Sequence, residues 1–219
     1  MSVPANVLFL SNVRISFPHL IEPQKTTNEV TGATRISYNA EFILPESHTG
    51  FAQFMSQYQA IMIDKFQENA PVVMGMILAD RKLRCFGSGE EKINKKTFIP
   101  YDGYAGNKYI TAGSDRQPQM IQDDGNPVDP VNTMAYQAIA RKIYGGCRVN
   151  AAVKLWPQQN RHGNGIRCDL VAVQFAGDDK PFGEGGAPDV KGLFGAVAQV
   201  SAGAGMFSPA PAVLPSFFK

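Results

Sequence analysis

The sequence predicts a mainly β domain that contains two helices and ends in a flexible tail. Several segments alternate apolar and polar residues with the period of two that is typical of strands. Two other segments carry apolar residues three and four positions apart, as amphipathic helices do. The last part of the chain, residues 177–219, is crowded with Gly, Ala, Pro and Ser and shows no lasting periodicity.

The first part of the chain predicts two strands and one helix. Residues 5–17 are rich in β-branched and aromatic residues and end at Pro18, which indicates a strand. Residues 33–44 place every second side chain on one apolar face and stop at Pro45, which indicates a second strand. Over residues 51–69, aromatic and methionine side chains recur at steps of three and four, so we expect a helix that faces the core.

The middle of the chain is less regular. Residues 72–86 and 97–101 have the composition of strands, and a polar bend with two glycines separates them. A long loop rich in turn residues follows Ile110. We therefore expect two short strands here, and no further regular element before residue 131.

The last elements are a helix and a hairpin. A helical pattern over residues 131–144 ends at two glycines, which commonly terminate helices. Residues 147–156 and 165–176 both read as strands and flank the turn PQQNRHGN, so a hairpin is expected. The prediction is therefore a folded domain over residues 1–176, followed by the tail over 177–219.

Composition excludes several classes of protein. The chain has 219 residues, of which 44% are hydrophobic, so it can form a core and is not disordered as a whole. Its apolar runs are too short to span a bilayer, and it lacks the pattern of a secretory signal. The three cysteines form no CxxC pair, which favours buried thiols in a reducing compartment over disulfides or zinc. These features predict a cytoplasmic protein without a membrane segment.

The charges are few but unevenly distributed. Only 18% of residues are charged, against roughly 25% in an average soluble domain. The net charge is +2, yet residues 141–168 contain six Lys and Arg and no acid. Residues 81–116 contain eight Lys and Arg against four acids. Such segregation is what a basic groove requires, so nucleic acid becomes a candidate ligand.

Aromatic residues are interleaved with these cations. Single-stranded nucleic acid uses both, because cations neutralise phosphates while aromatic rings stack on unpaired bases. In the middle segment the candidate contacts are Lys95, Lys96, Tyr101, Tyr104, Lys108 and Tyr109. The hairpin adds Arg148, Lys154, Arg161, Arg167 and the only tryptophan, Trp156, and the first two strands add Arg14 and Arg35 as secondary candidates. Some of these rings, and Phe98 beside them, are equally compatible with a place in the core.

Two other functions remain open. Asp123, Asp124 and Asp129 lie in one loop, as the ligands of a metal-dependent nuclease could, although their surroundings are also ordinary turn residues. A β-rich virion or scaffold protein would explain the low charge and the Gly/Ala-rich tail. The sequence contains no nucleophile elbow and no phosphate-binding glycine loop, so we expect no catalytic site, cofactor or metal.

The final hairpin and its exit carry a motif. A strand of the form G-x-x-V-x-x-x-V precedes a turn, a second strand of the form G-I-x-x-x-L-x-A-V-Q, and an exit that contains Phe-Gly. The matching positions are Gly146, Val149, Val153, Gly165, Ile166, Leu170, Ala172, Val173, Gln174, Phe182 and Gly183. With the opening NVLFLSNVRISFPHLIEP, the pattern resembles a family of tailed-bacteriophage single-stranded DNA-binding proteins over roughly residues 5–186.

This resemblance implies an oligonucleotide-binding (OB) fold, a five-stranded Greek-key barrel. It also implies a non-catalytic protein that coats single-stranded DNA in the host cytoplasm during phage DNA replication, recombination and repair. The helix over 131–144 then corresponds to the one that packs under such barrels, and the helix over 51–69 is an insertion. Phage or host replication proteins are the implied partners. The chain ends in VLPSFFK without the acidic run that recruits partners in many single-strand binders, so self-association of the tail is an equal candidate.

Overall fold

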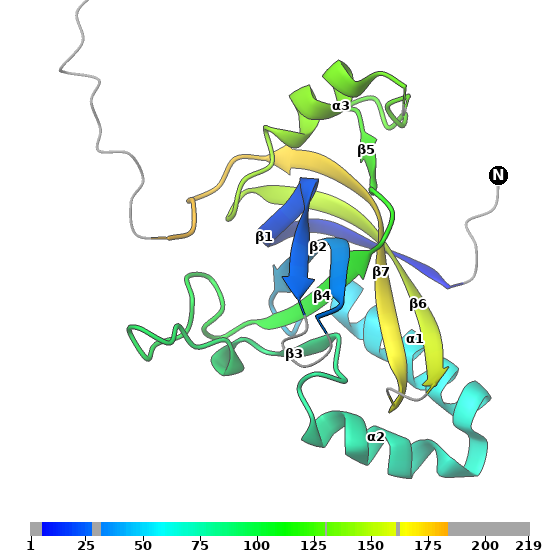
Figure 1. Cartoon of the computed structure of the whole chain (residues 1–219). Helices are drawn as coiled ribbons and strands as arrows, with labels where there is room; N and C mark the ends of the chain where they lie inside the picture. The colour runs from blue at the N-terminus through cyan, green and yellow to red at the C-terminus, as the bar shows by residue number, and fades with distance from the viewer. Residues whose placement is uncertain (1–5, 28–31, 130, 161–162, 184–219) are drawn as a thin grey trace, which may run out of the picture. The chain divides into compact units, whose positions relative to one another are not determined.

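Seven strands form one sheet in the order β3-β4-β2-β1-β6-β7-β5 (Figure 1). This arrangement is seen in a computed structural model that describes residues 6–27, 32–129, 131–160 and 163–183. The five longer strands are β1 (Val7–Thr27), β2 (Thr34–Leu44), β4 (Lys108–Ser114), β6 (Arg148–Asn160) and β7 (Gly163–Gly177). The two short strands are β3 (Phe86–Ser88) and β5 (Gln119–Ile121).

The central strand of the sheet is β1, which pairs antiparallel with both β2 and β6. β2 continues to β4, and β6 continues to β7, again antiparallel, whereas β5 joins β7 in parallel. The sheet curls far enough that β4 contacts β7. Register shifts in β1 help it to curl, because each bulge bends the strand and increases its twist.

Among the described residues, three α-helices pack on this sheet: α1 (Thr49–Phe66), α2 (Ala70–Ala79) and α3 (Thr133–Ala140). In Figure 1, α1 and α2 lie at one end of the curled sheet and α3 lies at the other end. The N-terminus of α1 is capped by His48, whose Nδ1 accepts a hydrogen bond from the backbone N–H of Gly50. Phe54, Tyr58 and Met62, four residues apart, bury one face of α1.

The main hydrophobic core lies inside the curl and under α1. Ile15 from β1, Phe42 from β2, Ile110 from β4, Val153 from β6 and Ile166 from β7 are all fully buried there. The three cysteines, Cys85, Cys147 and Cys168, are buried free thiols, as the sequence predicts. No helix among the described residues is both long and apolar enough to cross a membrane.

The prediction of a mainly β fold is confirmed, and the first two strands, the helix over 51–69 and the final hairpin are all present. The expected end of the first strand at Pro18 is wrong, because β1 continues to Thr27 and Pro18 lies at a register shift, where a proline is tolerated. The hairpin strands also continue through most of the turn expected at 157–164.

The strand expected over 72–86 is wrong for most of its length, because residues 70–79 form α2. This segment is apolar on every side, so it lacks the one-sided periodicity that identifies a helix. Pro71 lies in the first turn of α2, where its missing N–H costs nothing.

Three further expectations need correction. Residues 97–101 form a turn and an isolated bridge rather than a strand. The loop expected after Ile110 begins only after Ser114, since β4 continues to that residue, and the loop contains β5. The helix expected over 131–144 is shorter, because α3 covers only Thr133–Ala140. The predicted tail, 177–219, lies outside the described residues from 184 onward.

Candidate nucleic-acid interface

A groove of about 910 Å³ runs between two walls of the curled sheet. One wall is formed by β1, β2 and β4, and the other by the β6–β7 hairpin and the segment between α2 and β3. Alternate residues of β2 line the groove, because successive side chains of a strand point to opposite faces. These residues are Arg35, Ser37, Asn39 and Glu41. The intervening Ala40 and Phe42 point into the core. One face of β2 thus supports the fold while the other lines the groove.

Trp156 lies in the groove wall formed by the hairpin, and its indole is fixed in place. The indole Nε1–H donates a 2.7 Å hydrogen bond to Oδ1 of Asp169 on β7. The ring itself is only half-buried, so part of it faces the groove. A ring held in one orientation loses little entropy when a ligand stacks on it.

Three cations in the groove form no ion pair with any described residue: Arg35, Lys82 and Arg167. Arg167 lies directly across the hairpin from Trp156. Its Nε donates to the side-chain oxygen of Gln158 at 2.9 Å, and Nη1 donates to the carbonyl of Lys82 at 3.2 Å. Because no carboxylate neutralises these three side chains, their charge remains available to phosphates.

Two other cations in the groove are already paired. Arg84 donates two hydrogen bonds to Glu91, at 3.2 and 2.7 Å. Lys92 bonds Oε1 of Glu41 at 2.5 Å and lies 4.4 Å from the centroid of the Tyr109 ring. Of the two acids that line the groove, Glu41 is paired with Lys92, whereas Asp169 bonds the neutral indole of Trp156. Three unpaired cations against one unpaired carboxylate leave the described lining of the groove with a net positive charge.

Phe17 and Tyr101 supply two further rings. Phe17 is 47% exposed and packs edge-on against Tyr101, with 5.4 Å between the ring centroids. It has a φ of +47° beside a register shift in β1, and a bulge of this kind redirects a side chain. Sequence reasoning missed Phe17, because alternation alone does not reveal where a strand bulges. Tyr101 was among the candidates and does line the groove.

The structure revises the expectation for Tyr104 and Tyr109, because both rings lie in a second core cluster with Ile43. The hydroxyl of Tyr104 donates a 2.5 Å hydrogen bond to Oε2 of Glu41. Burial, and then the neighbouring Glu41 carboxylate, raises the pKa of Tyr104 far above its usual range, so the phenol stays a neutral donor. Neither ring is presented to a ligand.

The amino-acid sequence is similar to those of known phage proteins. Residues 6–201 match the family described as Enterobacter phage Enc34, ssDNA-binding protein. The chain belongs to this family. Protein p50 of Acyrthosiphon pisum secondary endosymbiont phage 1 is 30% identical over 184 residues, which cover 83% of this chain and 89% of p50.

Two solved structures of the single-stranded DNA-binding protein from bacteriophage Enc34 share the fold. The complex with ssDNA has a TM-score of 0.60 and 22% identity, covering 82% of this chain and 91% of that chain. The C-terminal truncation has a TM-score of 0.59 and 22% identity, covering 82% and 90%. At this level of identity the likeness establishes a shared fold and leaves the contact residues to be argued from this chain.

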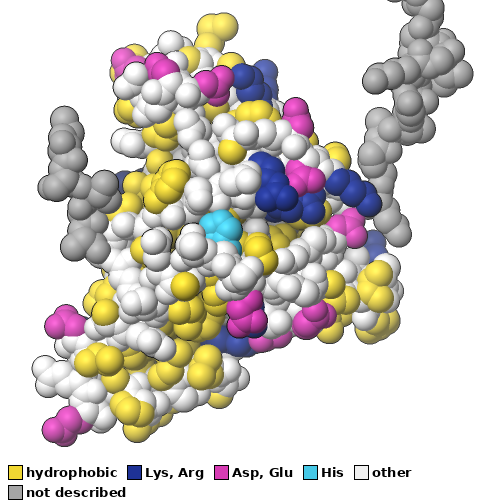
Figure 2. All heavy atoms as spheres, turned by 180° about the vertical axis from the view of Figure 1, so that it is seen from behind, with side chains coloured by type: hydrophobic (Ala, Val, Ile, Leu, Met, Phe, Trp, Pro, Cys, Tyr) yellow, Lys and Arg dark blue, Asp and Glu magenta, His cyan; other side chains and the backbone are white. Residues whose placement is uncertain are grey.

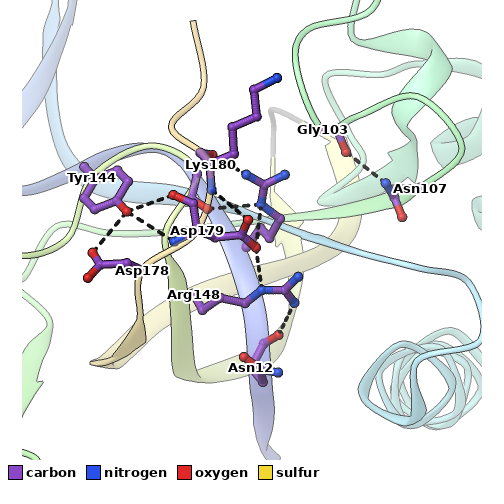
Figure 3. Close-up of polar contacts among 10 residues, drawn as sticks. Asn12, Gly103, Asn107, Tyr144, Arg148, Asp178, Asp179 and Lys180 are labelled. Carbon is purple, nitrogen blue, oxygen red and sulfur yellow. Dashed lines mark hydrogen bonds and ion pairs between the residues drawn. The ribbon is translucent and has the colours of Figure 1, made fainter. Parts of the chain in front are cut away.

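Arg14 and Arg148 lie outside the groove and contact the segment that follows β7. Figure 3 shows Arg148 beside Asp179 of this segment. Both guanidinium groups contact Oδ2 of Asp179, with N–O distances of 3.5 Å for Arg14 and 2.7 Å for Arg148. The hydroxyl of Tyr144 lies 3.1 Å from Oδ1 of Asp178 and 2.9 Å from the carbonyl oxygen of Asp179, so its one proton is shared between two acceptors in the same segment. The hydroxyl oxygen also accepts from the backbone N–H of Asp179. Residues 178–183, which we name the tail root, are thus docked on the domain, and the two arginines share the Asp179 carboxylate there.

This docking makes stability depend on pH. The backbone N–H of Lys180, and then the side chain of Arg148, lower the pKa of Asp179 below its ordinary 3.8. A lowered carboxyl pKa stabilises the fold above the unfolded value, and this contribution is lost as the pH falls through the folded value. Asp179→Asn should therefore reduce the free energy of unfolding at neutral pH, and the deficit should shrink well below pH 3.8.

Urea unfolding followed by Trp156 fluorescence measures this difference. Asp115→Asn is the control, because Asp115 is exposed and has no partner among the described residues. An equal deficit for Asp179→Asn at neutral and acidic pH would contradict the assignment.

The remaining candidates lie at other places. Lys95 and Lys96 are exposed in the segment between β3 and β4, and Lys154 is exposed on β6, two residues before Trp156 but outside the groove lining. Lys108 pairs with Glu46 at 3.4 Å. Arg161 lies outside the described residues.

Figure 2 shows that, on the face opposite to the view in Figure 1, Lys and Arg side chains lie next to Asp and Glu rather than forming a continuous basic area.

The acidic loop does not gather its carboxylates. Asp124 accepts hydrogen bonds from the backbone and side chain of Asn126, and Asp129 accepts from the backbone N–H of Val131. These are the contacts of ordinary turns. Among the described residues, no group of three or more His, Cys, Asp and Glu side chains is arranged to hold a metal ion.

Proposed function

We propose that this protein binds single-stranded DNA in the groove and coats it, without catalysis, during phage DNA replication, recombination and repair. The observation that carries this proposal is a half-buried Trp156 that lines one groove with three unpaired cations, Arg35, Lys82 and Arg167. Family membership supports it, since the Enc34 protein of the same fold forms a complex with ssDNA.

We propose further that the five long strands form an OB-type barrel. In that fold the first strand pairs with the second and fourth, and the barrel closes between the third and fifth. Here β1 pairs with β2 and β6, β2 pairs with β4, β6 pairs with β7, and β4 contacts β7. On this view β3, β5 and the α1–α2 pair are additions, and the binding domain ends near residue 176.

The rings favour single strands over duplex. In a duplex each base face is covered by the neighbouring pair, whereas an unpaired base can stack on Trp156, Phe17 or Tyr101. The β2 side of the groove carries short polar side chains such as Ser37 and Asn39. The side-chain amide of Asn39 already donates a 2.9 Å hydrogen bond to Gln24. Stacking accepts every base, so we expect little sequence preference.

The cations give the proposal a quantitative test. For a single strand, log K falls with log salt at a slope of about −0.7 for each phosphate neutralised. Lys82→Ala and Arg35→Ala should each weaken binding of oligo-dT and flatten the slope by about 0.7. Fluorescence anisotropy of a labelled oligo-dT at several salt concentrations measures both effects.

Lys142→Ala is the matched control, because Lys142 is an exposed cation beyond α3 that does not line the groove. We expect it to leave affinity and slope unchanged. If Lys82→Ala and Arg35→Ala have the same salt slope as the parent protein, the DNA phosphates do not bind in the groove. If the parent protein fails to bind oligo-dT, the proposed function itself is contradicted.

A further inference from the structure

A second hollow, of about 430 Å³, lies beside the groove, and we name it the end pocket. Its lining comes from three segments: the β1 bulge at residues 16–18, the segment of residues 94–102, and the tail root with Gly145. Phe17 and Tyr101 line both the groove and the end pocket. A ligand that follows the groove past this ring pair therefore enters the end pocket without leaving the protein surface.

Phe17 stands at the junction of the two hollows in an unusual conformation. A positive φ is rare for a large side chain, and such residues persist only where the surrounding structure enforces them, commonly at functional sites. At Phe17 the bulge turns the ring outward, and nearly half of the side chain stays exposed. A buried position would be the ordinary place for a phenylalanine, so exposure here leaves a ring face available to a ligand.

The segment between β3 and β4 forms the second wall and extends away from the sheet (Figure 1). Its tip is a defined turn: the N–H of Asn94 donates to Ile99 at 2.9 Å, and the N–H of Phe98 donates to Asn94 at 2.8 Å. Ile99 is 62% exposed on the pocket wall. Lys95 and Lys96 lie in the same turn and form no ion pair with a described residue, so positive charge flanks an apolar wall.

The tail root supplies the third wall. The N–H of Phe182 donates to the carbonyl of Gly145 at 2.8 Å, and the ring lies 4.2 Å from the guanidinium carbon of Arg14. The Phe182 ring packs directly on Gly103, where any side chain would clash with it, because a Cβ atom at this position would lie 2.4 Å from the ring. Gly183 donates its N–H to Oδ2 of Asp102 at 3.0 Å. This wall is thus built by specific contacts.

We infer that the end pocket receives an unpaired nucleobase of the same DNA strand, at the point where the strand leaves the groove. The base would stack on Phe17 and contact Ile99 and Phe182, while Lys95 and Lys96 would neutralise the adjoining phosphates. Aromatic and aliphatic walls with a few polar groups are typical of small-molecule pockets, and the flanking cations fit a nucleotide. This inference rests on the proposed function and assigns to it a contact beyond the groove.

The test is how the effect of a Phe17 variant depends on oligonucleotide length. Phe17→Leu keeps an apolar side chain but removes the ring, and Phe9→Leu is its matched control, since Phe9 is also exposed on β1 but lines neither hollow. Affinities for oligo-dT of roughly 4 to 16 nucleotides, the span of OB-fold site sizes, are measured by anisotropy. Because Phe17 also lines the groove, we expect a small loss of affinity for short oligonucleotides and a further, roughly tenfold loss once the strand reaches the end pocket.

A second variant and a second probe keep the test independent of folding effects. Lys95→Gln with Lys96→Gln should show the same length threshold and flatten the salt slope only above it. In wild-type protein, 2-aminopurine moved stepwise along the oligonucleotide should change its fluorescence at one terminal position, and Phe17→Leu should abolish that change.

The outcomes separate the two proposals. A Phe17→Leu defect that is equal at every length, or absent at every length, would overturn the end pocket while leaving groove binding intact. Failure of the wild-type protein to bind oligo-dT of any length would overturn the proposed function itself.

Discussion

Trp156→Ala is expected to weaken binding of oligo-dT by about 1–3 kcal/mol and to leave the salt slope unchanged. The ring offers a stacking surface in the groove, and the substitution removes that surface without removing a cation. Asp169 already holds the indole in position, so the full stacking contribution is available in the free protein. Anisotropy of a labelled oligonucleotide at several salt concentrations measures affinity and slope together.

Two controls define this result. Trp156→Phe keeps an aromatic face but loses the N–H bonded to Asp169, so it should retain most of the affinity. Phe9→Ala removes an exposed ring outside the groove and should have no effect. Unchanged affinity in Trp156→Ala would show that the indole does not contact DNA.

Glu41→Ala should lower the free energy of unfolding by about 3 kcal/mol. The Glu41 side chain is only 14% exposed and accepts hydrogen bonds from Lys92 and Tyr104, both at 2.5 Å. Removal of the carboxylate leaves a largely buried ammonium group and a buried phenol without their partner, which is the costly way to break such a pair. Urea unfolding followed by Trp156 fluorescence measures the loss.

Glu46→Ala provides the comparison, because Glu46 also pairs with a lysine, Lys108, but is 74% exposed. A pair so exposed to solvent contributes about 0–1 kcal/mol. A Glu41→Ala protein as stable as Glu46→Ala would contradict the view that the buried Glu41 carboxylate holds Lys92 and Tyr104 in place.

The sequence predicts well those elements whose signal is local. β-branched and aromatic composition predicts β1, period-two alternation predicts β2, and two strand-like runs around a turn predict the β6–β7 hairpin. The spacing of Phe54, Tyr58 and Met62 identified α1. In each case one apolar face packs on the core and the other meets solvent or the groove, so the pattern in the chain reflects burial directly.

Other features depend on tertiary context. The α2 segment is apolar on all sides, so its composition does not distinguish a helix from a strand. Tyr104 and Tyr109 have lysine-rich neighbours along the chain, yet they pack against Ile43 and each other in three dimensions. The outward position of Phe17 follows from a bulge in β1 that no residue pattern announces.

The groove itself is assembled from distant parts of the chain. Arg35, Lys82 and Arg167 come from β2, from the segment after α2 and from β7, and meet only because the sheet curls. Local charge counts emphasise the hairpin, which supplies Trp156 and Arg167 to the groove lining. They also emphasise Arg148, which pairs with Asp179 from the tail root. Charge density along a chain therefore does not show which cations remain unpaired in the folded protein.

The fluorescence of Trp156, the sole tryptophan, tests the central claim most directly. The protein is titrated with oligo-dT and, separately, with duplex DNA of equal length at the same salt concentration. We predict saturable quenching by the single strand, with an affinity at least about tenfold higher than for the duplex, because only unpaired bases can stack on the indole. Equal affinity for the two forms, or binding of oligo-dT without any change in Trp156 emission, would contradict it.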